Sequence, residues 1–139
     1  MDGLIMIDAL PPDNTVITVP VCMKDAAKRF DIPLRVFVGL WLTEGGKVGM
    51  QNKNTNGSID YGAFQINTVW AKELSKYGIT TEHLTNDFCI SAYSSAYIIR
   101  YRITESQGDF WDGIGRYHSK TPHLKNAYIK RVYKNSISF

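Results

Sequence analysis

The chain has 139 residues, a mass of 15.7 kDa and a formal net charge of +3 at pH 7. This length suits one compact domain with a sizeable core and is too short for two comfortable ones. With 44% hydrophobic and 21% charged residues, the composition excludes a disordered protein. The small positive charge is compatible with an anionic polymer but falls far below the clustered basic excess of nucleic-acid-binding proteins. We therefore expect no nucleic-acid partner.

Residues 1–20 are predicted to form an N-terminal arm that precedes the domain. The apolar run within residues 1–10 has no basic residue before it and is broken by Asp8, so it is not a signal peptide. No apolar run approaches the length of a transmembrane helix. We expect that a natural leader preceded Met1 and was removed, and the alternative is a cytoplasmic protein with an irregular tail. Residues 16–19 are β-prone and stop at Pro20, which predicts a short edge strand or an extended arm.

Two helices are predicted at the start of the domain, over residues 23–30 and from Pro33 to Glu44. Proline favours a first helical turn, and Gly45-Gly46 is the residue type that ends a helix in a left-handed turn. The apolar residues of the second helix follow the i, i+3, i+4, i+7, i+8 pattern of one buried face. They are Leu34, Phe37, Val38, Trp41 and Leu42.

Glu44 lies three residues after Trp41 and seven after Phe37, so it shares their side of the helix. Apolar burial and the negative end of the helix dipole both disfavour an ionised carboxylate, which should raise the pKa of Glu44. A carboxylic acid that stays protonated near neutral pH suits general acid catalysis. The alternative is a structural carboxylate at a helix end with Lys47 as a neighbouring charge, and these residues alone do not decide between the two.

The polar segment 51–64 contains an Asn56-Gly57 turn and predicts a small β-hairpin or irregular wing. A short helix is expected over 68–77, ending at Gly78, and a capped turn over 80–84. Asn86 is expected to cap the long central helix, whose apolar stripe consists of Phe88, Ala92, Ala96, Ile99 and Ile103.

Two more helices are predicted in the C-terminal part of the chain. The first is a short helix within residues 109–117. Thr121-Pro122 then opens the last helix, because proline fits the first helical turn. Its inward residues are predicted to be Leu124, Tyr128, Ile129 and Val132.

Glu44 followed by Gly62-Ala63-Phe64-Gln65-Ile66-Asn67 resembles the lytic transglycosylases of glycoside hydrolase family 23, in which a helix-terminal Glu precedes a Gly-x-x-Gln-x-x motif. Residues 54–58, leading to Asp60-Tyr61-Gly62, are most similar to the small enzymes of type III and type IV secretion, conjugation and type IV pilus systems. The resemblance extends from about Cys22 to Val132. It implies an α+β, mainly α, lysozyme-like single domain over residues 21–139 with a small β-hairpin wing.

The resemblance also implies a reaction, which is cleavage of the MurNAc-GlcNAc β-1,4 bond of peptidoglycan with formation of 1,6-anhydro-MurNAc ends. Glu44 would be the catalytic residue. Asp60 is expected to brace the loop by capping backbone N–H groups, although it is also a possible second carboxylate. The candidates for binding the sugar are Gln65, Tyr117, Asn67 and Asn52.

Tyr117 matches an active-site tyrosine of the family whose hydroxyl contacts the catalytic Glu or the sugar. The alternative is a buried tyrosine whose hydroxyl has a backbone partner. His118 stands where the family commonly has Asn. Two other functions stay open, namely a lysozyme-type hydrolase that uses Asp60 or a held water, and a non-catalytic wall-binding module.

The number of cysteines alone does not decide whether Cys22 and Cys89 are two buried thiols or form one disulfide bridge. The resemblance implies a disulfide between them and hence an oxidising compartment, the periplasm. His83, His118 and His123 show no metal-ligand spacing, so we expect no metal and no cofactor. The expected partners are peptidoglycan glycan strands and components of a secretion, conjugation or pilus complex, with the protein itself a monomer.

Overall fold

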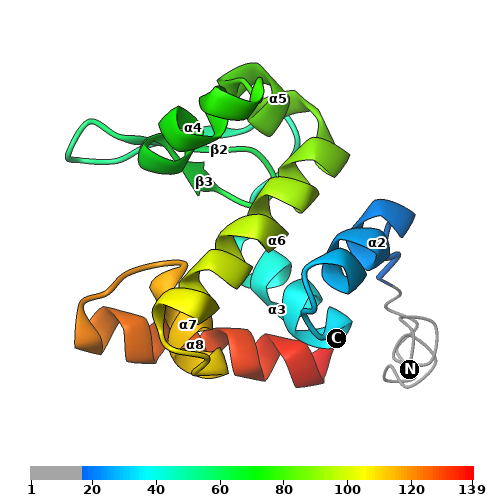
Figure 1. Cartoon of the computed structure of the whole chain (residues 1–139), viewed down its shortest axis with the longest axis vertical. Coiled ribbons are helices and arrows are strands. Elements are labelled where there is room, and N and C mark those ends of the chain that lie inside the picture. The colour runs from blue at the N-terminus through cyan, green and yellow to red at the C-terminus, as the bar shows by residue number, and fades with distance from the viewer. Residues whose placement is uncertain (1–16) are drawn as a thin grey trace.

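The computed structural model describes residues 17–139, which form a mainly helical protein with one small sheet (Figure 1). This is the α+β, lysozyme-like architecture predicted from the sequence. No helix within these residues is both long and apolar enough to cross a membrane. The helices are α2 (Val21–Arg29), α3 (Leu34–Glu44), α4 (Thr68–Leu74), the 3-10 helix η1 (Ser75–Tyr77), α5 (Thr81–Asn86), α6 (Phe88–Glu105), α7 (Phe110–Arg116) and α8 (Pro122–Ser138).

The N-terminal arm is described only in part. Residues 17–20 belong to no helix or strand, so the predicted edge strand is absent from the described part of the arm. The predictions about a removed leader concern residues outside the described range. The division into an arm over 1–20 and a domain over 21–139 stays a prediction for the same reason.

Helix α6 crosses the middle of the molecule and is its core helix (Figure 1). Its predicted stripe is confirmed, because Ala92, Ala96, Ile99 and Ile103 are buried and Phe88 packs against the core. The predicted cap is wrong by one residue. Asn86 still belongs to α5, and the carboxylate of Asp87, the first extended residue after it, accepts the N–H of Ile90 at 2.9 Å.

Helix α3 packs against the C-terminal helix α8 at very short range. A Cβ atom at Gly39 would lie 2.8 Å from the carbonyl oxygen of Val132, so only glycine allows this approach. Val36 and Leu40 are buried as well as the predicted Phe37 and Val38, because α3 is covered on more than one side, with Phe37 stacked on Phe64.

Two residues predicted to point inward are instead exposed. Leu42 is 36% exposed because the faces of α3 that carry Phe37, Gly39 and Leu40 make the buried contacts. Leu124 is 43% exposed because α3 ends at Glu44 opposite Tyr128, one helical turn further along α8. The periodicity is therefore correct for the middle of each helix and fails near one end.

The wing is a three-stranded antiparallel sheet formed by β1 (Gln51–Lys53), β2 (Ile59–Tyr61) and β3 (Ile66–Asn67) in that order. The predicted hairpin around the Asn56-Gly57 turn is thus present, and β3 adds a strand that was not predicted. Asp60 pairs with Asn67 across β2 and β3. This register brings two of the predicted site residues side by side.

The predicted disulfide is present. Cys22 on α2 is bonded to Cys89 in the first turn of α6, with 5.6 Å between their Cα atoms. These are the two cysteines of the sequence, so no free thiol remains. The bond ties the first described helix to the start of the core helix.

Candidate active site

Glu44 is the last residue of α3, and Gly45 follows it in the left-handed conformation with φ of 65°, as the sequence predicts. The carboxylate is half-buried, and Oε2 accepts the hydroxyl proton of Tyr128 at 2.5 Å. Burial is the main cause that raises the pKa of Glu44, which reaches about 7, and the negative charge of Asp60 adds to the rise. The hydrogen bond from Tyr128 and the charge of Arg131 act in the opposite direction. Glu44 is therefore half protonated near neutral pH.

Tyr128 belongs to the site, although the sequence predicted it only as a core residue. It lies on α8, is 1% exposed, and its ring stacks on His118 with 4.9 Å between the centroids. A buried tyrosine hydroxyl needs a polar partner, so the inward position of Tyr128 could have indicated that a polar group lies opposite it. Helical periodicity gave its inward direction but not the partner on α3.

Tyr117 does not hold Glu44. Its hydroxyl donates to the carbonyl of Phe64 at 2.9 Å and lies 2.9 Å from Oγ of Ser95, which can donate to it. The alternative of a buried tyrosine with a backbone partner thus describes its hydroxyl, and the bond to Glu44 comes from Tyr128 instead. Burial raises the pKa of Tyr117 well above its usual value, so it stays neutral.

Asp60 braces the wing through a side chain, not through backbone N–H groups as predicted. Its Oδ1 accepts from Nδ2 of Asn67 at 2.8 Å, because the two residues are opposite each other in the sheet. Asn67 also donates to Oγ of Ser58 at 3.1 Å and caps α4 by accepting the N–H of Val69 at 3.2 Å. Asn67 therefore fixes the wing to α4.

Gln65 adopts the left-handed backbone conformation, with φ of 52°. Its Nε2 donates to the carbonyl of Gly62 at 2.8 Å, and its Oε1 accepts from Nδ2 of Asn52 at 2.7 Å. Gly62 itself approaches α5 so closely that a Cβ atom would lie 2.0 Å from the carbonyl of Leu84. The Gly-x-x-Gln spacing thus allows a tight turn, and this turn orients the Gln65 side chain.

A polar cavity of about 350 Å³ opens in front of Glu44, within the usual size of ligand clefts. The structure brings Asp60, Gln65, Asn67 and Tyr117 to its wall together with Glu44. Asn52 does not line it and instead positions Gln65. The wall also contains four residues that were not predicted from the sequence, namely Asn54, Asn56, Ser58 and Trp70.

The cavity presents hydrogen-bonding groups around two carboxyl groups, those of Glu44 and Asp60. His118 also lines it, and burial followed by the charge of Arg131 lowers the pKa of its imidazole, which favours the neutral form. Among residues 17–139 no group of three or more His, Cys, Asp or Glu side chains is placed to hold a metal ion. A carboxyl group with a pKa near neutrality in such a cavity is able to exchange a proton with a bound polar group.

The fold and this cleft define a lysozyme-like protein with a glutamate of raised pKa at the C-terminal end of α3. No family model matches the chain. It is 30% identical over 119 residues to invasion protein IagB of Salmonella typhimurium, covering 82% of this chain and 74% of that protein. It is also 31% identical over 118 residues to protein IpgF of Shigella flexneri, covering 81% and 77% of the two chains. The chain belongs to the family of IagB and IpgF.

A shorter match links the chain to X polypeptide of Escherichia coli, with 33% identity over 79 residues. This match covers 52% of the chain and 46% of that protein.

Replacing Tyr128 with Phe should raise the pKa of Glu44, because the lost hydrogen bond favours the ionised carboxylate. A general acid works in its protonated form, so a catalytic role for Glu44 predicts that activity falls as pH rises through about 7 in the native protein. In the variant this fall of activity, the alkaline limb of the pH profile, is expected at higher pH. The maximal rate is expected to be about tenfold lower, because a hydrogen bond to a charged group is lost. The measurement is the pH dependence of kcat/KM on purified peptidoglycan.

Tyr133→Phe is the matched control, since Tyr133 lies on the same helix and is 54% exposed. It should leave the profile unchanged. An alkaline limb that stays in place or moves to lower pH in Tyr128→Phe would show that this hydroxyl does not stabilise ionised Glu44.

Proposed function

We propose that this protein is a peptidoglycan lytic transglycosylase that cleaves the MurNAc-GlcNAc β-1,4 bond and leaves 1,6-anhydro-MurNAc ends. The observation that carries the proposal is Glu44, whose pKa of about 7 keeps an acid available in a polar cavity at neutral pH. The resemblance of Glu44 and the Gly62–Asn67 motif to glycoside hydrolase family 23 supplies the substrate and the product.

In the proposed reaction Glu44 acts twice. It first donates its proton to the glycosidic oxygen as the bond between that oxygen and C1 of MurNAc breaks. The Tyr128 hydroxyl then stabilises the resulting carboxylate. Glu44 next removes the proton of the MurNAc 6-hydroxyl, whose oxygen attacks C1 and closes the anhydro ring. The proton balance is restored without water as a reactant and without a cofactor.

The other cavity residues have proposed roles in sugar binding. Gln65 is held in place at both ends of its amide, by Gly62 and Asn52, so it presents a fixed group to the glycan. Tyr117 and Asn67 lie on the same wall. Asn52 acts indirectly, through Gln65.

We also propose where the protein works. One relative is named an invasion protein, and the resemblance is to enzymes of secretion, conjugation and type IV pilus systems. The disulfide supports an oxidising compartment, and with peptidoglycan as the proposed substrate we propose that this compartment is the periplasm. The protein would act there as a monomer that opens the cell wall locally for such an apparatus.

Mass spectrometry of purified peptidoglycan after digestion tests the reaction. Anhydro ends as the main product are expected. Reducing ends would instead indicate a lysozyme-type hydrolase, and an unchanged polymer with retained binding would indicate a wall-binding module. Both of these outcomes contradict the proposal.

Asp60→Asn separates the transglycosylase from the hydrolase. We expect the variant to retain most of the activity and the anhydro product, because an Asn oxygen can still accept the hydrogen bond from Asn67. The lost negative charge should also lower the pKa of Glu44 and move the alkaline limb to lower pH. Activity and product are measured on the same peptidoglycan.

Asp25→Asn, on the exposed side of α2, is the control for loss of one negative charge. A hydrolase that uses Asp60 as its second carboxylate predicts the opposite result. In that case the native protein gives reducing ends, and Asp60→Asn is as inactive as a variant without Glu44.

A further inference from the structure

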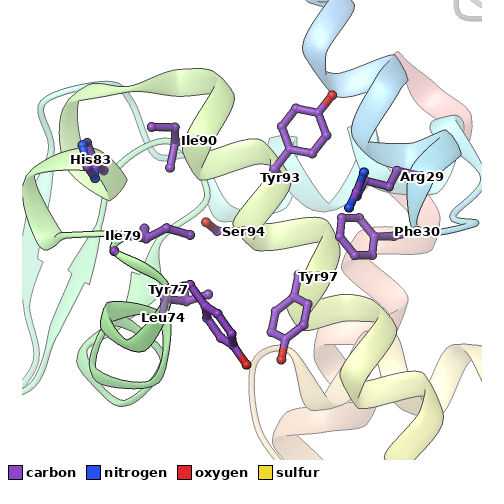
Figure 2. A pocket seen from close by; sticks show the side chains of 11 residues that line it. Arg29, Phe30, Leu74, Tyr77, Ile79, His83, Ile90, Tyr93, Ser94 and Tyr97 are labelled. Carbon is purple, nitrogen blue, oxygen red and sulfur yellow. The ribbon is translucent and has the colours of Figure 1, made fainter.

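A second cavity, of about 480 Å³, lies between the end of α2, η1 and α6 (Figure 2). It shares no lining residue with the cavity at Glu44. Its lining is mostly aromatic and aliphatic, whereas amides and carboxylates line the first. We call it the α6 groove, defined by Phe30, Tyr77, Ile79, Tyr93, Ser94 and Tyr97.

Ser94 lies in the middle of the α6 groove (Figure 2) and is 2% exposed. Its hydroxyl has no hydrogen-bond partner in the described part of the chain. Buried hydroxyl groups in proteins are nearly always hydrogen-bonded. An occupant that offers an acceptor to Ser94 would satisfy this group.

Aromatic rings line the part of the groove around Tyr97. Its ring meets Tyr77 edge-on at 6.5 Å and Phe30 at 6.1 Å between centroids. Tyr77 is 66% exposed although it is a large side chain. An exposed tyrosine beside an apolar hollow is typical of surfaces that bind a bulky apolar side chain of another protein.

Arg29 supplies a positive charge at one end of the groove, beside Phe30 (Figure 2). It lies over the Phe30 ring at 5.7 Å, and no carboxylate within residues 17–139 forms an ion pair with it. The described lining residues include neither Asp nor Glu. A guanidinium in this state is complementary to a carboxylate, which it can bind through two parallel hydrogen bonds.

We propose that the α6 groove binds a short segment of a partner protein in which a bulky apolar side chain lies next to an Asp or Glu. The apolar side chain fills the hollow between Tyr77, Ile79 and Tyr97. The acidic side chain pairs with Arg29, and a backbone carbonyl of the segment accepts the hydroxyl proton of Ser94. This site is separate from the proposed wall-cleaving site and does not depend on it.

The test selects random twelve-residue peptides displayed on phage against the native protein, with counter-selection against Ser94→Leu. A leucine at this position is expected to occupy part of the groove, because Ser94 lines it. Enriched peptides are expected to share a bulky apolar residue beside Asp or Glu. A fluorescent copy of the consensus peptide then measures binding by anisotropy. Arg29→Ala should weaken binding about tenfold, as expected for a lost charged hydrogen bond.

Lys28→Ala is the matched control, since Lys28 precedes Arg29 on α2 but does not line the groove. It should bind the peptide as the native protein does. Arg29→Glu should lose the acidic peptide and regain binding to its lysine-substituted copy. Arg29 is exposed, so this charge swap tests the proposal even if Ser94→Leu fails to fold. Glu44→Gln should bind the peptide normally, which separates the groove from catalysis.

Three results would overturn the proposal. In the first, the enriched peptides lack an acidic residue. In the second, they bind the Arg29→Glu variant as tightly as they bind the native protein. In the third, no peptide is enriched while Arg29→Glu weakens sedimentation with purified cell-wall sacculi, which would make the groove a site for the wall polymer.

Discussion

Glu44→Gln is expected to reduce peptidoglycan cleavage at least about a hundredfold, since general acid catalysis typically contributes 10² to 10⁴. Gln has the shape of Glu and can still accept the hydroxyl proton of Tyr128, but it cannot donate a proton and recover it. The release of soluble fragments from purified peptidoglycan measures the loss. Glu82→Gln, on the exposed first turn of α5, is the control.

The same variant should remain folded, and its stability should depend on pH in a particular direction. The folded-state pKa of Glu44 is raised from 4.5 to about 7, so ionisation costs the native protein stability as pH rises through this range. The Glu44→Gln variant has no such cost. The difference between its melting temperature and that of the native protein should therefore increase as pH rises over that range. A variant that retains more than about a hundredth of native turnover would refute the catalytic role of Glu44.

Removing the disulfide is expected to have the largest effect on stability. In the chain-entropy model a bond that joins residues separated by 67 positions contributes about 4 kcal/mol. The double variant Cys22→Ser and Cys89→Ser should melt at least about 10 °C lower than the native protein. Calorimetry with and without a reductant measures this difference, and the reductant should leave the double variant unchanged.

The double variant should keep its activity at low temperature, because neither cysteine lines the cavity at Glu44. Thiol titration of native protein made in an oxidising compartment should find no free thiol under denaturing conditions. Two reactive thiols, or equal melting temperatures, would contradict both the bond and the proposed periplasmic location.

Local patterns were sufficient to predict most of the fold. Glycine after Glu44 fixed the end of α3, and the spacing of apolar residues gave the buried face of α6. The short strand β3 was not predicted, because two residues are too few for an alternating pattern. The cap of α6 was misplaced by one residue, since Asn86 and Asp87 are both good capping residues and only the end of α5 decides between them.

Those properties of the site that are set by residues close together in the sequence could be predicted. The apolar positions on its own helix were enough to predict that burial raises the pKa of Glu44, and the Gly62–Asn67 motif contains the turn that holds Gln65. Contacts between distant elements were not predictable. Tyr128 and Glu44 are 84 residues apart, and periodicity indicates that each points inward without indicating that they meet. Asp60 binds Asn67 because of a strand register that depends on β3.

The pairing of Glu44 with Tyr128 has a consequence for the order in which a newly made chain becomes complete. A ribosome or an export channel releases the chain from its N-terminus, so the acid emerges 84 residues before the phenol that hydrogen-bonds to it. Gly39 likewise remains uncovered until α8 docks. A nascent chain that ends before Pro122 therefore contains Glu44 without the helix whose tyrosine hydrogen-bonds to it, and this hydrogen bond forms only after α8 has been synthesised.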